Sequence, residues 1–289
     1  MTERTLAEKH EQLQRILGKM KSVAVAFSAG VDSTVLLKVA VDVLGAGNVT
    51  AVTGRSPSLA PAELDQARDL TASIGVEHVV VDTREFDNPE YCRNPANRCY
   101  LCKSALYDQM KRLIEKRGID FVVAGTNADD LSDYRPGIDA GRDFGVRAPV
   151  AEAGLDKKDL RDLARQLGLS VHDKPASPCL ASRIPYGEAI TPEKLRAVEA
   201  AETYLHELGI RECRVRHHDT VARIEVPGEF IPLLAEAENA ARVDRYLRSL
   251  GYQYVALDLR GFRSGSLNEV LAIDTRAGEP KGTRRAGAT

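Results

Sequence analysis

The chain has 289 residues, of which 43% are hydrophobic and 28% charged, with a formal net charge of −2. This length predicts one large domain or two smaller ones. The mild acidity does not indicate a protein that binds nucleic acid through bulk positive charge. No apolar run is long enough to cross a membrane, and the charged N-terminus lacks the apolar stretch of a signal peptide, so the sequence predicts a cytoplasmic protein.

Apolar, β-branched runs alternate with helical patterns over the first part of the chain. Strands are predicted at 23–27, 49–53, 78–82 and 121–125, and helices at 5–20, 31–43, 61–74, 101–116 and 157–167. This alternation is typical of βαβ units, with helices on both faces of a parallel sheet. A polar, glycine-rich stretch at 127–145 is long for a loop, and such loops are often functional.

A second, smaller unit is predicted after a stretch of prolines and small residues at 174–185. Its pattern consists of a helix that begins at Thr191, an antiparallel pair of strands at 211–217 and 221–226, a helix at 231–250 and a strand at 252–257. We therefore predict an α/β domain over 1–175, an α+β domain over 176–275 and a disordered tail over 276–289.

The first predicted strand ends in small and hydroxyl residues directly before a helix. In open α/β sheets, ligands bind beyond the carboxyl ends of the strands, where a helix N-terminus offers N–H groups and partial positive charge. Ser28 and Ser33 can add hydroxyl donors, and Asp32 could hold a metal ion or accept helix N–H groups. The pattern favours phosphate binding over a plain capped turn, but it is not a Walker loop, because no lysine follows it.

The segment Ser28-Ala29-Gly30-Val31-Asp32-Ser33 resembles the SGGxDS motif of the PP-loop ATP pyrophosphatase superfamily. The resemblance implies an adenine nucleotide alpha hydrolase-like fold for the α/β domain. It also implies ATP and Mg²⁺ as cofactors, with the pyrophosphate bound in this loop and a substrate activated by adenylation. The sequence departs from the motif at Ala29, where glycine is usual. An alanine is tolerated there if its φ is not positive.

Six further segments resemble the LarE family, over roughly residues 10–270: RCYLCK, GTNADDLSDYRPG, APVAEAGLDKKDLR, KPASPCLASRIPYG, CRVRHHDTVARIEV and LDLRGFRSGSLN. The resemblance implies an AMP-forming sulfur transferase, and an assembly of several copies. Its substrate would be pyridinium-3,5-biscarboxylic acid mononucleotide, whose carboxylates are adenylated and converted to thiocarboxylates. The product serves the nickel-pincer nucleotide cofactor of lactate racemase.

The chain has five cysteines, at positions 92, 99, 102, 179 and 213. An odd number in a cytoplasmic chain argues against a disulfide framework and indicates metal, redox or catalytic use. Cys179 lies near Lys174 and Arg183 in the sequence, and nearby cations favour the reactive thiolate. The LarE resemblance implies that Cys179 supplies sulfur, and that in single-cysteine members it becomes dehydroalanine.

Cys99 and Cys102 form a C-x-x-C pair at the start of a predicted helix, which alone fits a redox pair, half a zinc site or a capped turn. The resemblance implies that both join Cys179 in holding a [4Fe–4S] cluster, whose open iron can bind sulfide from an external donor. A zinc site and a sacrificial Cys179 without metal remain the alternatives. Cys92 could instead complete a four-thiolate site. Cys213 is predicted to pack in a core.

Arg214 and Arg216 fall on one side of a predicted strand. They form either a solvated charged face with cross-strand ion pairs or, as the family segment favours, a clamp for a substrate phosphate. Arg183, four residues after Cys179, could hold a substrate phosphate or carboxylate. Glu202, on the preceding helix, is either a surface charge or an acid/base group.

Gly125 and Thr126 follow a predicted strand and should lie at the same sheet edge as Ser28. They are predicted to contribute to the nucleotide site. The next acidic residues, Asp129 and Asp130, could be Mg²⁺ ligands or could cap a turn.

Three rival functions fit parts of this pattern. A tRNA thiolase of the PP-loop type would need a basic surface. An amidating synthetase would leave Cys179 unexplained. The third rival is a nucleotide- or cluster-binding protein without catalytic activity. The sequence favours the sulfur transferase, with a small nucleotide substrate and no membrane or nucleic-acid partner.

Overall fold

The computed structural model describes residues 4–132 and 136–263, so the predicted tail at 276–289 lies outside the described residues. The chain divides into two compact units. The first comprises Met1–Ala181 and Tyr186–Arg196, and the second comprises Ser182–Pro185 and Ala197–Thr289. The domain limits predicted from the sequence, at residues 175 and 275, stay predictions.

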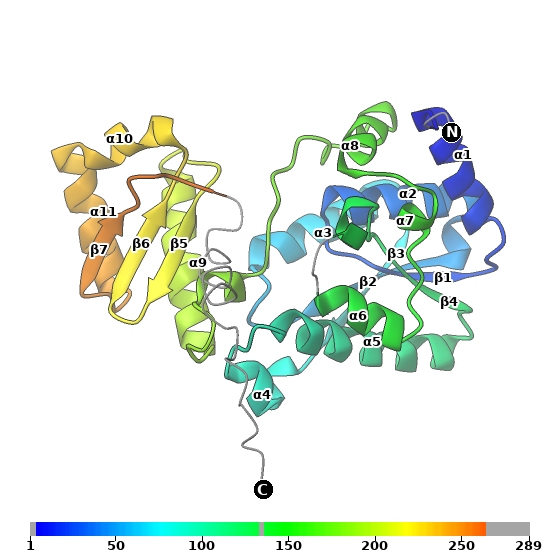
Figure 1. Cartoon of the computed structure of the whole chain (residues 1–289), viewed down its shortest axis with the longest axis horizontal. Helices are drawn as coiled ribbons and strands as arrows, with labels where there is room; N and C mark the ends of the chain where they lie inside the picture. The colour runs from blue at the N-terminus through cyan, green and yellow to red at the C-terminus, as the bar shows by residue number, and fades with distance from the viewer. Residues whose placement is uncertain (1–3, 133–135, 264–289) are drawn as a thin grey trace, which may run out of the picture. The chain divides into compact units, whose positions relative to one another are not determined.

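Four parallel strands form the sheet of the first unit, in the order β3-β2-β1-β4 (Figure 1). Their bounds are β1 (Val23–Ala26), β2 (Val49–Arg55), β3 (Glu77–Asp82) and β4 (Phe121–Ala124). The first residue of β1, Val23, lies opposite Val49 on one side and Phe121 on the other. The predicted parallel α/β sheet is therefore confirmed, and the carboxyl ends of β1 and β4 lie side by side.

Helices cover both faces of this sheet. They are α1 (Leu6–Leu17), α2 (Val31–Leu44), α3 (Pro61–Ile74), α4 (Pro89–Cys92), α5 (Arg98–Arg117), α6 (Pro136–Asp143), α7 (Pro149–Glu152) and α8 (Lys157–Gln166). Alternate side chains of β1 point to opposite faces. Val23 and Val25 pack in a core with α1, α2, α3 and α8, and Ala24 and Ala26 pack in a second core with α5 and α6. Burial on both faces explains the continuous apolar runs in the sequence.

The stretch 127–145, expected to be a long loop, contains regular structure. It includes α6 and a 3₁₀ turn at Asp129–Ser132. Other 3₁₀ turns lie at Ala46–Asn48, Glu85–Asp87, Leu180–Arg183 and Gly228–Phe230. The apolar residues that would have indicated α6 are few, because this helix is short and buries mainly Ala140 and Gly141.

The second unit contains a three-stranded sheet of order β5-β6-β7. Its elements are α9 (Pro192–Glu207) from Ala197 onward, β5 (Arg214–His218), β6 (Val221–Glu225), α10 (Ile231–Ala235), α11 (Ala237–Ser249) and β7 (Tyr254–Leu257). The β5–β6 pair is antiparallel, and β7 joins β6 in parallel. Cys213 is fully buried in the core of this unit beside Val215, as predicted.

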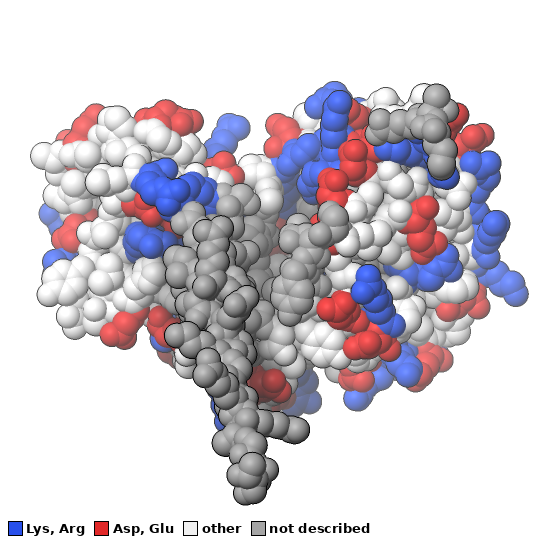
Figure 2. Space-filling view, viewed as in Figure 1, with Lys and Arg blue, Asp and Glu red and all other residues white. Residues whose placement is uncertain are grey.

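None of the helices in the described ranges is long and apolar enough to cross a membrane. On the face of the molecule in Figure 2, acidic and basic side chains are interspersed. Charge of one sign therefore does not dominate that face.

Candidate functional site

The loop after β1 turns directly into α2. Gly30 is the N-cap of α2, and it offers no side-chain hydrogen bond to the helix. Ser33 Oγ accepts the Ser28 N–H at 3.3 Å, lies 3.1 Å from Ser28 Oγ and donates to the Gly30 carbonyl at 3.2 Å. Residues 28–33, here called the PP-loop, thus form a compact turn at a helix N-terminus, where partial positive charge favours an anion.

Ala29 adopts a left-handed backbone conformation in this loop, with a φ of 55°. Its side chain is fully buried. From the sequence, an alanine is expected to be tolerated here only if its φ is not positive. The structure does not meet this condition. This conformation costs a residue with a Cβ about 1–2 kcal/mol, whereas glycine adopts it readily. The geometry accounts for the glycine that is usual at this position of the motif.

The end of β4 packs against the PP-loop through Gly125. A Cβ atom at this position would lie 2.7 Å from Ser33 N and 2.9 Å from the carbonyl carbon of Asp32. Only glycine permits so close an approach. Thr126 follows directly, and its carbonyl accepts the N–H of Ala151 at 3.1 Å. The two residues predicted to join the nucleotide site thus lie at the same sheet edge as the loop.

Both carboxylate oxygens of Asp32 have partners. Lys157 Nζ lies 2.5 Å from Oδ1, and Asn127 Nδ2 donates to Oδ2 at 2.9 Å. Lys157 is the first residue of α8, a position set by the capping box of Asp156 and Asp159. The sequence did not single out Lys157, which lies 125 positions after Asp32.

Asp129 and Asp130 both take part in hydrogen bonds to the backbone. Asp130 Oδ2 accepts the Asn127 N–H at 3.1 Å, and Asn127 Oδ1 accepts the Asp130 N–H at 3.1 Å. Asp129 Oδ2 accepts the N–H of Lys157 at 3.0 Å. These bonds correspond to the turn-capping alternative, and a role of either residue as a Mg²⁺ ligand stays a prediction.

Cys99, Cys102 and Cys179 belong to one neighbourhood of the first unit. Burial raises the pKa of the Cys102 thiol, and the charges of Glu85 and Cys179 act in the same direction. Burial also raises the pKa of Cys99, and the charge of Cys179 adds to this effect. The thiols of Cys99 and Cys102 therefore both lie where the charge of Cys179 affects them.

Lys103 and Cys92 lie on the same part of the chain as the C-x-x-C pair. The Lys103 ammonium lies 6.0 Å from the centre of the Tyr107 ring, and electrostatic interactions with Tyr107 and then with the three cysteines raise its pKa. Cys92 differs from the other three: its thiol donates to the Phe86 carbonyl at 3.4 Å, and its pKa is raised by burial and by Glu85. Within the described part of the chain, no group of three or more His, Cys, Asp or Glu side chains is placed to hold a metal ion.

Hydrogen bonds attach the chain that follows Cys179 to the rest of the first unit. The N–H of Leu180 donates to the Ser58 carbonyl at 2.9 Å, and Arg98 Nη1 donates to the Ala181 carbonyl at 3.0 Å. Arg98 is itself buried at the start of α5, directly before Cys99. The exposed Cys179 is thereby held on the same part of the fold as the C-x-x-C pair.

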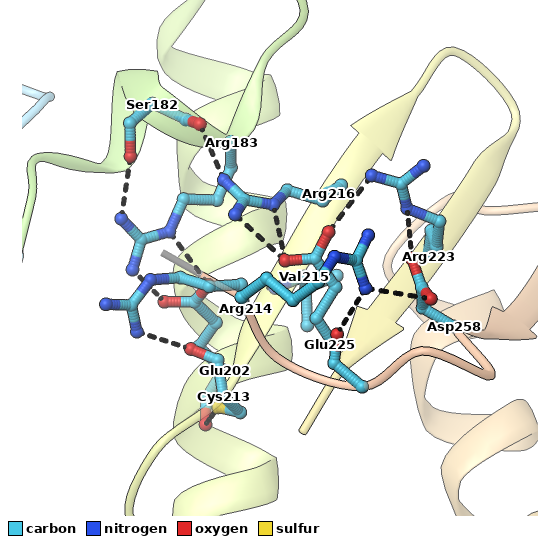
Figure 3. A network of polar contacts seen from close by, with 12 residues as sticks. Ser182, Arg183, Glu202, Cys213, Arg214, Val215, Arg216, Arg223, Glu225 and Asp258 are labelled. Carbon is cyan, nitrogen blue, oxygen red and sulfur yellow. Dashed lines mark hydrogen bonds and ion pairs between the residues drawn. The ribbon is translucent and has the colours of Figure 1, made fainter. Parts of the chain in front are cut away.

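In the second unit, Arg183 and Glu202 form a buried ion pair (Figure 3). Arg183 Nε donates to Glu202 Oε1 at 2.9 Å, and Arg183 Nη2 donates to Oε2 at 2.8 Å. Glu202 Oε1 also accepts the N–H of Val215 at 2.9 Å. Glu202 is therefore not the surface charge that was one of its two readings. An acid/base role for it stays a prediction.

We expect Glu202→Ala to lower the free energy of unfolding by about 3–5 kcal/mol, because it leaves the buried Arg183 guanidinium without its carboxylate. Urea or thermal unfolding measures the change. Glu207→Ala, an exposed change at the end of the same helix, should stay within about 0.5 kcal/mol of the parent protein. A loss below about 1 kcal/mol for Glu202→Ala would mean that the pair behaves like an exposed one.

A second carboxylate, Glu225, joins two arginines in the same cluster. Arg216 Nε and Nη2 donate to Glu225 Oε2 at 3.1 and 2.9 Å, and Arg223 Nη2 donates to Oε1 at 3.0 Å. Arg216 Nη1 also donates to the Ser182 carbonyl at 2.9 Å. Arg223 Nε lies 3.7 Å from Asp258 Oδ2. The Arg216–Glu225 pair is buried and not part of a solvated face, whereas the Arg223 side chain is 32% exposed.

Arg214 completes what we call the arginine cluster, which comprises Arg183, Arg214, Arg216 and Arg223 with Glu202, Glu225 and Asp258. The Arg214 guanidinium donates to the Cys213 carbonyl at 2.6 Å and lies 5.0 Å from the centre of the Phe262 ring. Burial lowers its pKa, and the charge of Arg183 adds to this effect. The cluster holds more guanidinium groups than carboxylates, so its chemistry suits an anion.

A cavity of about 420 Å³ opens beyond the carboxyl ends of β2 and β3. Its lining comprises Arg55, Ser56, Pro57, Asp82, Arg84, Glu85, Phe86 and Asp87. It lies at the same sheet edge as the PP-loop, where open α/β sheets bind their ligands. The sequence did not indicate it, because its residues come from two separate strand ends.

Comparison with known proteins extends these observations. The chain is 46% identical over 266 residues to an uncharacterized protein of Synechocystis sp., covering 92% of this chain and 99% of the relative. It is 40% identical over 272 residues to the pyridinium-3,5-bisthiocarboxylic acid mononucleotide synthase of Lactiplantibacillus plantarum, covering 92% of this chain and 96% of the relative. No protein-family model matches the chain.

A more distant likeness concerns part of the chain. The NH(3)-dependent NAD(+) synthetase of Aeropyrum pernix is 32% identical over 174 residues, which cover 53% of this chain and 56% of the synthetase. Together with the PP-loop at the end of β1, the identity to the mononucleotide synthase over nearly its whole length shows that the chain belongs to the LarE family of the PP-loop ATP pyrophosphatase superfamily.

Proposed function

We propose that this protein is an ATP-dependent sulfur transferase that converts pyridinium-3,5-biscarboxylic acid mononucleotide to the bisthiocarboxylic acid, a step in making the nickel-pincer nucleotide cofactor. The observation that carries the proposal is the 40% identity to a synthase of that product over 96% of its length. The PP-loop at the carboxyl edge of a parallel sheet supports ATP as the activating substrate.

Adenylation gives the substrate carboxylate a good leaving group. A carboxylate oxygen attacks the α-phosphorus of ATP, pyrophosphate leaves, and an acyl adenylate forms. The backbone N–H groups at the start of α2 would bind the departing pyrophosphate, and Asp32 would hold the Mg²⁺ that neutralises its charge. Sulfur then attacks the acyl carbon and displaces AMP.

Sulfur can reach the acyl carbon directly from Cys179. The thiolate displaces AMP to form a thioester. Elimination then breaks the Cβ–S bond, which leaves a thiocarboxylate on the product and dehydroalanine in the protein. This route consumes one protein molecule for each sulfur atom. It uses neither Cys99 nor Cys102.

We also propose that Cys99, Cys102 and Cys179 hold a [4Fe–4S] cluster, which supplies, when bound, an open iron for inorganic sulfide. The type of donor suits such a cluster, because thiolates are its usual ligands, and the charges of Arg98 and Lys103 act on Cys99 and would offset negative charge there. Because the pKa values of Cys99 and Cys102 are raised, ligation would release protons from these two thiols. The three side chains would have to converge to bind.

The proposal is tested by incubating the purified protein anaerobically with ATP, Mg²⁺, sulfide and the biscarboxylic mononucleotide. We expect AMP and pyrophosphate, together with a product in which sulfur has replaced a carboxylate oxygen. Mass spectrometry and a pyrophosphate assay follow the two products. ATP consumption without any thiocarboxylate would overturn the assignment. A cytoplasmic location, an assembly of several copies and the identity of the sulfide donor stay predictions.

The arginine cluster is proposed to bind the substrate phosphate, so Arg214→Ala and Arg216→Ala should weaken substrate binding more than ATP binding. A charge-assisted hydrogen bond contributes about 1.5–3 kcal/mol, and calorimetry with each ligand measures the loss. Because Arg216 also holds Glu225, Arg216→Lys should accompany it as a variant that keeps the charge. Arg248→Ala, an exposed change in the same unit, is the control. If the variants change only the affinity for ATP, the arginine cluster does not bind the substrate phosphate.

A further inference from the structure

The ammonium group of Lys174 contacts the backbone of the PP-loop. Lys174 Nζ donates to Glu63 Oε2 at 2.7 Å, to Gln66 Oε1 at 2.5 Å and to the Ala29 carbonyl at 3.2 Å. The Lys174 side chain is only 14% exposed. An ammonium group has three N–H donors, so these three acceptors use all of them.

The backbone from which this side chain extends is also held in place. Arg161, on α8, donates to the His172 carbonyl and to the Lys174 carbonyl, both at 2.9 Å. The N–H of Lys174 donates to the Val171 carbonyl at 3.0 Å. The ammonium group is therefore fixed both by its stem and by its two partners on α3, and its third bond goes to the loop.

The Ala29 carbonyl belongs to the one residue of the PP-loop whose backbone is unfavourable for its side chain, with a φ of 55°. Glycine would adopt this conformation without a steric penalty. An alanine keeps it only where its surroundings hold it. A partly buried, charged donor on its carbonyl is such a restraint, because charge-assisted hydrogen bonds are the stronger kind.

We propose that Lys174 is a positioning residue for the nucleotide: its bond to the Ala29 carbonyl keeps the PP-loop in the left-handed turn that presents its N–H groups to pyrophosphate. Lys174 would not touch the nucleotide and would act through Ala29. The inference rests on the proposed binding of ATP in this loop. It assigns a role to the lysine five residues before Cys179, which in the sequence alone is only a cation near that thiol.

A purely structural role is the competing account. Lys174 also forms an ion pair with Glu63, and its loss could loosen α3 without any particular effect on Ala29. The two accounts differ in one respect. If the lysine acts by holding Ala29, then replacing Ala29 with glycine, which needs no restraint, should remove most of the dependence on Lys174.

The experiment is a double-mutant cycle with Lys174→Met and Ala29→Gly, read out by calorimetric binding of Mg²⁺-pyrophosphate and by the KM for ATP. Methionine keeps the length of the stem and removes the charge. In the parent background we expect Lys174→Met to weaken pyrophosphate binding about five- to thirtyfold, the factor that corresponds to a restraint of the size of the left-handed penalty. In the Ala29→Gly background the same change should weaken binding less than threefold.

Lys194→Met is the matched control, since Lys194 also bridges a carboxylate and a carbonyl, Glu188 at 2.7 Å and Ala189 at 3.0 Å. It should not change pyrophosphate binding. If Lys174→Met does not fold, Glu63→Gln replaces it in the cycle. Glu63→Gln should cause a smaller loss of pyrophosphate affinity, and Ala29→Gly should remove that loss as well.

An equal loss in both backgrounds overturns the inference, as does an unchanged affinity in Lys174→Met. A parent protein that binds pyrophosphate but never forms AMP from ATP overturns the proposed function and leaves the inference to be judged by the binding cycle. A parent protein that binds no pyrophosphate overturns both.

Discussion

Asp32→Ala is expected to lower the rate of pyrophosphate release from ATP by about 10²–10³-fold, the loss typical when one preorganised electrostatic group is removed from an active site. Asp32 is the only acidic residue in the PP-loop. It lies in the first turn of α2, and its two oxygens are oriented by Lys157 and Asn127. A carboxylate held from both sides is prepared to receive Mg²⁺ with little reorganisation, and alanine removes that ligand.

The fold should survive this change, because Asp32 is not part of the buried core. Asp32→Asn separates charge from shape: it keeps the size of the side chain and should still lose most of the activity. Asp42→Ala, which removes an exposed carboxylate near the other end of the same helix, is the control and should retain the parent rate. Circular dichroism checks the fold of all three variants. ADP and phosphate as products, in place of AMP and pyrophosphate, would contradict the PP-loop mechanism itself.

The position of this site could be predicted from the sequence because it depends on local patterns. A buried parallel strand reads as an apolar run, and its end is marked by the change to small and hydroxyl residues. The N-terminus of a helix must follow within a few residues. Gly125 was placed at the same edge for the same reason, since neighbouring parallel strands end together.

The partners of the loop could not be predicted, because they depend on contacts between distant segments. Lys157 reaches Asp32 across 125 positions, and Lys174 reaches Ala29 across 145. A lysine is usually a solvated charge, and nothing in the local sequence pattern distinguishes these two from other lysines. The sequence leaves the sign of φ at Ala29 open for a related reason: the residue type gives no sign of a conformation that its surroundings impose.

The charged strands of the second unit show the limit of periodicity. Alternation correctly put Arg214 and Arg216 on the side opposite Val215. It could not tell whether that side faces water, because buried ion pairs and solvated ones share the same pattern. In the structure, the carboxylates of Glu202 and Glu225 form buried ion pairs in this cluster, with Arg183 and Arg216 respectively. Glu202 lies on α9, so the pattern of the strands alone could not reveal it.

The second large effect concerns the source of the sulfur. We expect Cys179→Ala to abolish thiocarboxylate formation under either route, because the residue is the sulfur donor in one and a cluster ligand in the other. Cys99→Ala and Cys102→Ala separate the two routes. If the cluster operates, each should lose iron and acid-labile sulfide and stop turning over with added sulfide. If Cys179 is sacrificed, both should still deliver one sulfur for each protein molecule.

Cys92→Ala is the matched control, since Cys92 lies in the same unit but its thiol donates to the Phe86 carbonyl. It should keep its iron. Loss of iron in Cys92→Ala would indicate a four-thiolate site without an open iron, and would remove the reason to expect sulfide binding.

The measurements are iron and sulfide content, the visible absorption spectrum of anaerobically purified protein, product formed per protein molecule, and the intact mass of the used enzyme. The cluster route predicts many products per molecule and an unchanged mass after the cluster is removed. The sacrificial route predicts at most one product and the loss of the mass of H₂S at position 179. The C-x-x-C pair favours the first outcome, because a sacrificial Cys179 needs neither Cys99 nor Cys102.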